Sequence, residues 1–292
     1  MIESGCLAEA CLQQTISVIV AAKNSLPDLQ RLVGSFREIG SLRTELVIVD
    51  GAGNDGTSEW LASLTARAES PRIVSISQSD SGIAEAWNRG VRLARGRWLV
   101  FLGADDRLGS ADAWRAVVDR LESLPPRCGV AAFPVRIVTP GGVILAEEVP
   151  RLGAGGGQFP AVNAIPHQGA FHRRSLWEAH GDFDTLFAIA ADYEFLLRMW
   201  SAGVEIQACE GPPPVAMTFG GASKRSPLVN VREFGRARRL HGVRVSPLNQ
   251  GREWVFAAIR SGLAAVLGES VTRRLADLGR RIRGLPPVWS VP

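Results

Sequence analysis

The sequence predicts an α/β fold: a mostly parallel sheet with helices on both faces, followed by a helical C-terminal extension. Three observations support this prediction. Short apolar runs alternate with helical patterns through the first hundred residues, which is typical of a parallel sheet wound with helices. Each run is apolar almost throughout, as expected for strands covered on both faces. The C-terminal region places apolar residues at spacings of three and four, which favours helices.

The first hundred residues contain four strands with a helix between each pair. The strands are expected at residues 15–22, 45–50, 72–77 and 97–103, and the helices at 26–40, 57–68 and 82–96. Open parallel sheets bind ligands beyond the carboxyl ends of their strands. The residues that follow these strands are therefore the first candidates for a functional site.

The pattern changes after a helix expected at residues 110–124. GVAAFPVRIV and GVILAEEV flank the turn sequence TPGG, which predicts a β-hairpin over residues 129–149. A strand, a short helix, a turn at Gly181 and a helix over residues 190–203 are expected next. Two basic helices follow, at residues 228–241 and 252–283.

Charge is distributed unevenly along the chain. Residues 231–292 hold 12 arginines against 4 acids, a net charge of +8, so residues 1–230 carry −4 of the chain's total of +4. A basic C-terminal region indicates contact with an anionic surface. A membrane surface and simple packing on the preceding domain are both open for its apolar stripe. Nucleic acid is not expected, because aromatic and basic residues do not interleave and no nucleic-acid-binding motif is present.

The cysteine pattern predicts a reducing compartment. The four cysteines are far apart and form no CxxC pair, which argues against a disulfide framework or a zinc site. The first 14 residues carry acids where a signal peptide needs positive charge. No run approaches the ~20 apolar residues of a membrane span. We therefore expect a cytoplasmic protein, with peripheral contact at the inner face of the cell membrane as a further option.

The segment LVFLGADDRL ends a predicted strand on two adjacent carboxylates, Asp105 and Asp106. Adjacent like charges repel, so the pair requires an explanation. Hard cations such as Mg²⁺ prefer carboxylate oxygens together with phosphate oxygens of a substrate. The alternative is that one aspartate caps the following helix. The position at the ligand-binding edge of the sheet favours the cation.

Asp50 ends the second strand and opens the glycine-rich loop DGAGNDGT. A carboxylate there could accept hydrogen bonds from a ribose hydroxyl or a base N–H, and an ordinary strand-to-helix turn is the alternative. A nicotinamide dinucleotide fold also ends its second strand on an acid, but it requires GxGxxG after the first strand. The first strand here runs into AAKNSLPD, which contains no glycine. The phosphates of a nucleotide must therefore be neutralised elsewhere.

Four ordered segments resemble the family 2 glycosyltransferases of the GT-A fold, especially bacterial enzymes of cell-surface polysaccharide assembly. They are ISVIVAAKN, ELVIVDGAGNDGT, SQSDSGIAEAWNRGVRLARGRWLVFLGADD and HQGAFHRRSLWEAHGDFDTLFAIAADYEFLLR, within residues 15–203. The resemblance implies a nucleotide-diphosphate sugar donor, Mn²⁺ or Mg²⁺ as cofactor, inversion at the anomeric carbon and a glycan or lipid-linked acceptor. UDP is the nucleotide it favours. The implied domains are a lead-in at 1–14, a GT-A domain at 15–218 and a basic helical region at 219–292.

The resemblance also implies roles for five acids. Asp50 matches the acid near the nucleoside base, and Asp80 matches a second acid along that site. Asp105 and Asp106 match the end of the DxD-type metal-binding motif. Asp192 matches the last carboxylate of the ED-type motif, the catalytic base.

The chain departs from this pattern at two points. Many relatives carry another aspartate where this chain has Gly103, which leaves Asp106 as the expected direct metal ligand and Asp105 near the ribose or metal-bound water. The ED-type pair is here Ala191 with an aspartate, and Glu194 lies two residues beyond that aspartate. Residues two apart on a helix face different sides, so only one of the two acids points into the cleft.

Five further residues are weaker candidates. His167 and Gln168 could orient phosphate or acceptor, and Asn88 could face the donor. Arg173, with the arginine that follows it, could pair with phosphate oxygens.

Two rival functions remain open. A sugar-phosphate nucleotidyltransferase should carry a segment like GxGTRxxPLT after the first strand, and none is present. A catalytically silent glycosyltransferase-like scaffold is the other rival, and the retained acids at positions 50, 105, 106 and 192 argue against it.

Overall fold

The fold is described from a computed structural model of the chain. The structure describes residues 15–40, 42–66, 71–152, 159–161, 163–220 and 226–282. The lead-in expected at residues 1–14 lies outside the described residues.

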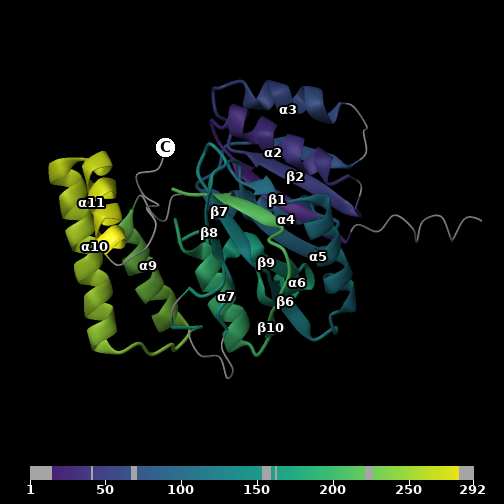
Figure 1. Ribbon diagram of the computed structural model, residues 1–292. Helices are drawn as coiled ribbons and strands as arrows, with labels where there is room; N and C mark the ends of the chain where they lie inside the picture. The colour runs from purple at the N-terminus through teal and green to yellow at the C-terminus, as the bar shows by residue number, and fades with distance from the viewer. Residues whose placement is uncertain are drawn as a thin grey trace, which may run out of the picture.

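A seven-stranded sheet forms the centre of the molecule (Figure 1). Its strands, in spatial order, are β10 (Glu205–Ala208), β6 (Cys128–Ala132), β9 (Ala170–Arg173), β4 (Trp98–Gly103), β1 (Ile16–Ala22), β2 (Thr44–Asp50) and β3 (Ile73–Ser77). Only β9 runs antiparallel to its neighbours. The mostly parallel sheet is therefore confirmed. The carboxyl ends of β1 to β4 lie at one edge, where Ala22 pairs with Asp50 and Ala21 with Gly103.

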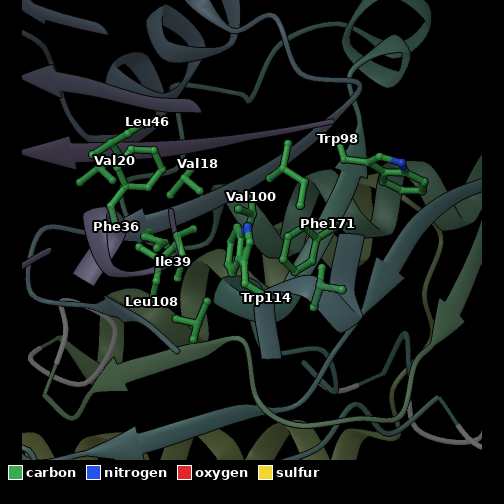
Figure 2. Close-up of a cluster of buried hydrophobic side chains, with 14 of the residues drawn as sticks. Val18, Val20, Phe36, Ile39, Leu46, Trp98, Val100, Leu108, Trp114 and Phe171 are labelled. Carbon is green, nitrogen blue, oxygen red and sulfur yellow. The ribbon is translucent and has the colours of Figure 1, made fainter. Parts of the chain in front are cut away.

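Helices cover both faces of this sheet, as predicted. One face is covered by α2 (Leu26–Glu38), α3 (Thr57–Thr65) and α5 (Ala111–Ser123), and the other by α4 (Ile83–Leu93), α6 (Ser175–His180) and α7 (Ala191–Ser201). Because side chains alternate along a strand, Val18 and Val20 join the first core and Ile19 joins the second. Figure 2 shows the first core, in which Phe36 and Trp114 pack on the strands.

A smaller, four-stranded sheet lies beside the large one. Its order is β5 (Arg107–Leu108), β11 (Val215–Thr218), β7 (Val135–Val138) and β8 (Ile144–Glu148). The β7–β8 hairpin is confirmed, but the single strand expected before it is wrong. Pro134 divides that segment, so β6 joins the large sheet and β7 the small one. Proline has no N–H to donate to a sheet, which explains the switch at this residue.

In the part of the chain that the structure describes, three helices follow the sheets: α9 (Pro227–Leu240), α10 (Pro247–Leu267) and α11 (Glu269–Ile282). The single helix expected over residues 252–283 is wrong, because Gly268 takes a positive φ of 80° and ends α10. In Figure 1, α9 lies between α7 and the pair of α10 and α11. Among the described helices, none is both long and apolar enough to cross a membrane.

Candidate active site

The carboxylate of Asp50 has one oxygen paired and one unpaired at the end of β2. Oδ2 accepts hydrogen bonds from Ser77 Oγ at 2.6 Å and Ser58 Oγ at 2.9 Å. Oδ1 is buried and has no hydrogen-bond partner in the described part of the chain. Buried polar atoms nearly always have a hydrogen-bond partner, so Oδ1 is placed to accept a hydrogen bond from a ligand. Neither serine belongs to a recognisable motif, and the only sequence signal is that Ser77 ends β3 and Ser58 lies in the first turn of α3.

Asp80 lies beside the residue that follows Asp50. A Cβ atom added at Gly51 would lie 2.7 Å from Asp80 Oδ2 and 3.2 Å from Lys23 Cδ. The segments that leave β1, β2 and β3 therefore converge here, and only glycine leaves room at position 51. Asp80 thus lies beside the segment that directly follows Asp50. Lys23 is exposed.

Asp106 is held inside the turn that follows β4. Its Oδ2 accepts the Gly103 N–H at 2.8 Å, and its Oδ1 accepts the Thr218 N–H of β11 at 3.0 Å. Burial raises the pKa of Asp106 to about 7, and the neighbouring charge of Asp105 adds to the increase. Hydrogen bonds, including one from the Gln168 side chain, oppose it. Both carboxylate oxygens of Asp106 are thus already used within the protein.

Asp105 is the exposed member of the pair. Its backbone carbonyl accepts the Thr218 hydroxyl at 2.6 Å, so β11 fixes the turn from both aspartates. A Cβ atom at Gly103 would lie 2.7 Å from Asp105 Oδ1 and 3.4 Å from Asp106 Oδ2. The glycine that replaces the aspartate of many relatives therefore lines the space in which the two carboxylates meet.

A 3-10 turn, His167–Gly169, connects this pair to Asp192. The Gln168 side chain hydrogen bonds to Asp106. His167 lies close enough to Asp192 for the charge of that carboxylate to affect the pKa of the imidazole. His167 is 7% exposed, its ring stacks on Phe101 at 5.5 Å, and neither ring nitrogen has a hydrogen-bond partner among the described residues. Burial lowers the pKa of His167, and Asp192 opposes that change. The imidazole is therefore neutral near pH 7.

His172 is fully buried beside His167, with ring centroids 5.9 Å apart. Burial, with a smaller contribution from His167, holds the pKa of His172 well below the ordinary value of 6.5. An unfolded chain takes up a proton below pH 6.5 and the folded chain does not, so stability is lost as pH falls.

We expect His172→Phe to reduce this acid sensitivity. The titration of His172 should cost about 1.4 kcal/mol at pH 5.5 relative to pH 7.5. In a chain of this size, that corresponds to about 3 to 5 °C in Tm. Thermal unfolding at both pH values measures it. The variant should show a smaller drop in Tm than the wild type, and equal drops would contradict the assignment.

Asp192 lies in the first turn of α7 and is partly buried. Its Oδ1 accepts the Tyr193 N–H at 2.7 Å. No side chain of α7 itself caps the helix, since Ala190 occupies the N-cap position. The N–H groups at a helix start need acceptors. Asp192 accepts that of Tyr193, and the N–H groups of the three residues before α7 find acceptors on another element.

Glu233 of α9 provides those acceptors. Its carboxylate accepts N–H groups from Ala188, Ile189 and Ala190, each at 2.9 Å, and the side chain is only 5% exposed. A carboxylate is favourable at a helix N-terminus because the helix dipole is positive there. The loop that leads to Asp192 is therefore fixed by a residue more than 40 positions away, which no local pattern in the sequence reveals.

Glu233→Gln is expected to lower kcat about tenfold and to leave the donor KM within about twofold. Glutamine offers one acceptor oxygen, so buried N–H groups lose their partner at about 1–3 kcal/mol, and the loop before Asp192 shifts. Steady-state kinetics with a thermal melt measure both effects. Glu178→Gln, an exposed acid on α6, is the matched control. A changed KM with unchanged kcat would contradict the positioning role.

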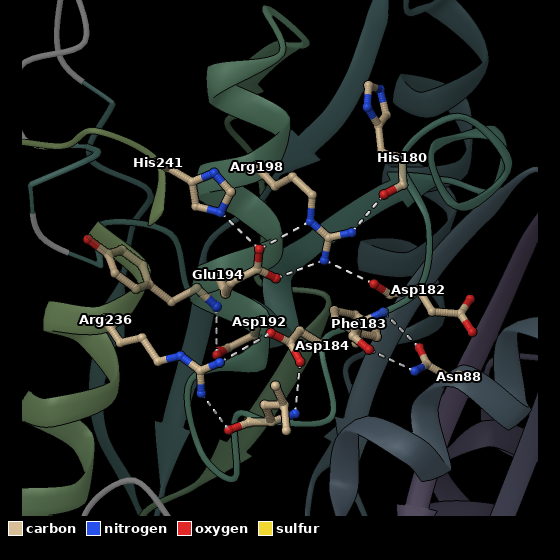
Figure 3. A network of polar contacts seen from close by, with 12 residues as sticks. Asn88, His180, Asp182, Phe183, Asp184, Asp192, Glu194, Arg198, Arg236 and His241 are labelled. Carbon is tan, nitrogen blue, oxygen red and sulfur yellow. Dashed lines mark hydrogen bonds and ion pairs between the residues drawn. The ribbon is translucent and has the colours of Figure 1, made fainter. Parts of the chain in front are cut away.

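Glu194 points into a structural network instead of the site (Figure 3). It is 4% exposed and pairs with Arg198 Nη2 at 2.8 Å and with His241 Nε2 at 2.9 Å. Arg238 of α9 also contacts this helix, donating to Tyr193 Oη at 3.2 Å. These contacts separate the two acids of α7, as their spacing predicts.

The structure gives Asn88 a structural role. Its amide donates to the Phe183 carbonyl and accepts the Phe183 N–H, both at 2.9 Å (Figure 3). The side chain is 4% exposed. Both of its polar side-chain atoms are engaged with the loop before α7, so Asn88 holds that loop and is not assigned a contact with a ligand.

The expected phosphate contacts of Arg173 and Arg174 are wrong. Arg173 pairs with Trp98, the first residue of β4, and so lies at the opposite edge of the sheet from Asp105. Its Nε donates to the Cys128 carbonyl at 2.7 Å. The antiparallel direction of β9 carries both arginines away from the carboxyl ends of the parallel strands.

Comparison with known proteins identifies the family to which the chain belongs. The model of the family described as "Glycosyl transferase family 2" matches residues 17–182. The chain belongs to glycosyltransferase family 2. Asp50, Asp80, Asp105 and Asp106 all lie within the matched region of this glycosyltransferase, and Asp192 lies just beyond it.

A curated relative is the PGL/p-HBAD biosynthesis glycosyltransferase of Mycobacterium bovis. It is 34% identical over 190 residues, which cover 63% of this glycosyltransferase and 69% of the relative.

Solved structures show that the fold is GT-A. S. aureus TarS 1–349 in complex with UDP-GlcNAc superposes with a TM-score of 0.60 at 16% identity, over 82% of this chain and 70% of that one. This glycosyltransferase spans 42% of a longer TarS structure. The mannosyltransferase PcManGT of Pyrobaculum calidifontis, in complex with GDP-Man and Mn²⁺, gives a TM-score of 0.58 at 16% identity, over 93% and 81%.

Proposed function

We propose that this glycosyltransferase transfers a sugar, with inversion, from a UDP-sugar to a hydroxyl of a glycan or lipid-linked acceptor in cell-surface polysaccharide assembly. The observation that carries the proposal is the convergence of acids at one sheet edge. Asp50 ends β2 and Asp105 follows β4, and β1 lies between these two strands at the same edge. The 3-10 turn links the Asp105–Asp106 turn to Asp192. The UDP-GlcNAc bound to TarS and the relative named for PGL/p-HBAD biosynthesis support it.

The nucleoside would contact the Asp50 end of the site. The unpaired Oδ1 of Asp50 is suited to accept an N–H of a uracil base, while the two serine hydroxyls keep the carboxylate fixed. Asp80, on the adjacent loop, would accept hydrogen bonds from the same nucleoside.

A divalent cation fits the Asp105 end. Within the described residues, no group of three or more histidine, cysteine or acidic side chains is placed to hold a metal. One or two carboxylates plus donor phosphates are, however, the usual set for Mg²⁺, and Mn²⁺ accompanies GDP-Man in PcManGT. We assign direct contact to the exposed Asp105 and a supporting role to Asp106, because backbone N–H groups already occupy both Asp106 oxygens. The bound cation would supply positive charge to the departing diphosphate.

Asp192 would act as the general base. In the reaction, Asp192 takes the proton of the acceptor hydroxyl as its oxygen bonds to the anomeric carbon, and the bond from that carbon to the diphosphate breaks. Attack opposite the leaving group produces inversion. The neutral His167 beside Asp192 would orient the base or acceptor without adding a competing charge. A cytoplasmic location is part of the proposal, and the free, buried thiols of Cys128 and Cys209 are consistent with it.

A panel of nucleotide sugars tests this function. With Mn²⁺, a UDP-sugar should raise Tm by about 5 °C or more at saturating concentration, and UDP release should require the metal. A silent scaffold would show no metal-dependent release of nucleotide. Stabilisation by GDP-sugars alone would replace UDP in the proposal, and no response to any nucleotide sugar would contradict it.

A further inference from the structure

Helix α11 presents its apolar side chains to solvent and polar ones to the protein. Its exposed apolar residues recur at spacings of three and four, which places them on one side of the helix. They are Val271 at 40%, Leu275 at 43%, Leu278 at 54% and Ile282 at 78% exposure. Thr272 and Asp277 are buried instead, at 6% and 2%. A helix on the surface of a globular protein normally shows the reverse arrangement.

Helix α10 carries a similar outward stripe. Val255, Ile259 and Val266 are 57% to 81% exposed at helical spacing, whereas Ala257 is buried against the protein. The two helices lie side by side at the far side of α9 from the catalytic domain (Figure 1). We call the exposed apolar stripes of the two helices the outer face: Leu248, Val255, Ile259 and Val266 of α10, and Val271, Leu275, Leu278 and Ile282 of α11.

An exposed apolar patch that extends over two helices marks an interaction surface. The charge around it decides whether a second copy of the chain or a membrane covers it. Arg252, Arg274 and Arg281 are exposed on the two helices, and residues 231–292 carry 12 arginines against 4 acids. A second copy of the chain would bring two strongly basic regions together. A bilayer that contains anionic lipids offers both an apolar interior and the opposite charge.

We propose that α10 and α11 dock this protein on the surface of an anionic bilayer, with the outer face at the acyl boundary and the arginines among the headgroups. The polar side of α11 and the Ala257 side of α10 stay on the protein. Arg238 of α9 donates to Glu253 of α10 at 2.7 and 3.0 Å. Glu233 and Arg238 of α9 also contact the loop and helix that carry Asp192, so α9 connects them to the docked helices. The proposal rests on exposure and charge alone, so it holds whichever acceptor the enzyme uses.

Vesicle flotation of the full chain tests the proposal. The protein should float with vesicles of equal parts phosphatidylcholine and phosphatidylglycerol, and far less with phosphatidylcholine alone. Raising the salt from about 0.1 M to about 0.5 M should weaken binding, since charge attraction is screened. Leu275→Glu with Leu278→Glu should reduce the bound fraction about tenfold or more. Val255→Glu with Ile259→Glu tests α10 in the same way.

The matched control is Ile144→Glu, an equally exposed apolar residue of β8 at 60%, which should float like the wild type. Far-UV circular dichroism confirms folding, and UDP release without vesicles should be unchanged in every variant, so that loss of docking is distinguished from loss of activity. A folded wild type that does not float overturns the proposal. The proposal is also overturned if analytical ultracentrifugation shows a dimer that the α11 substitutions dissociate and the protein does not bind vesicles.

Discussion

Asp192→Asn is expected to lower kcat by about a thousandfold and to leave donor affinity within about twofold, since a general base contributes roughly 10² to 10⁴ to rate. Asparagine keeps the oxygen that accepts the Tyr193 N–H, so the start of α7 should hold its shape. What is lost is the ability to take the acceptor proton. Single-turnover transfer and calorimetric titration of UDP measure the two quantities separately.

Asp182→Asn is the matched control for this substitution. Asp182 lies in the loop before α7 and forms a half-exposed ion pair with Arg92 at 3.1 Å. Exposed pairs contribute little, so activity should stay near that of the wild type. A large loss of UDP affinity in Asp192→Asn would move the residue from the acceptor side to the donor side of the site.

Asp105→Asn is expected to weaken UDP binding in the presence of Mn²⁺ about a hundredfold, a change of ~2.7 kcal/mol. The physical reason is that a neutral amide is a poor ligand for a hard cation, and the diphosphate then meets the negative site without compensation. In the absence of metal, variant and wild type should bind UDP equally weakly. Calorimetry with and without EDTA measures both conditions.

Asp112→Asn controls for charge near this turn, because Asp112 is 91% exposed in the first turn of α5. Its UDP affinity should match the wild type within about twofold, since isolated surface charges are screened. If Asp105→Asn retains metal-dependent binding and Asp106→Asn alone abolishes it, the assignment of the two aspartates is reversed. Loss of binding in Asp106→Asn accompanied by a lower Tm would instead reflect its buried backbone contacts.

The parallel core of the fold is predictable from sequence because its information is local. Each of the first four strands is a largely apolar run, and each helix between them shows one apolar face. The remaining strands are short, and distant partners determine them. β11 forms by pairing with β5 and β7, and only Pro134 signals that β6 and β7 belong to different sheets.

The site follows the same division. Positions such as Asp50 and Asp105 can be predicted, because residues after parallel strands gather at one edge. Their orientation depends on contacts far along the chain. Thr218 decides which aspartate of the pair is buried, from 112 residues away, and Glu233 fixes the loop before Asp192 from 43 residues away. Sequence spacing carries no signal for either contact.

The most direct measurement is an anomalous diffraction map of crystals soaked with UDP and Mn²⁺. The proposed function predicts one manganese peak at about 2 Å from the Asp105 carboxylate, bridged to the diphosphate, with the uracil hydrogen bonded to Asp50 Oδ1. Nucleotide bound with no manganese beside Asp105, or bound away from the edge that holds Asp50, would contradict it.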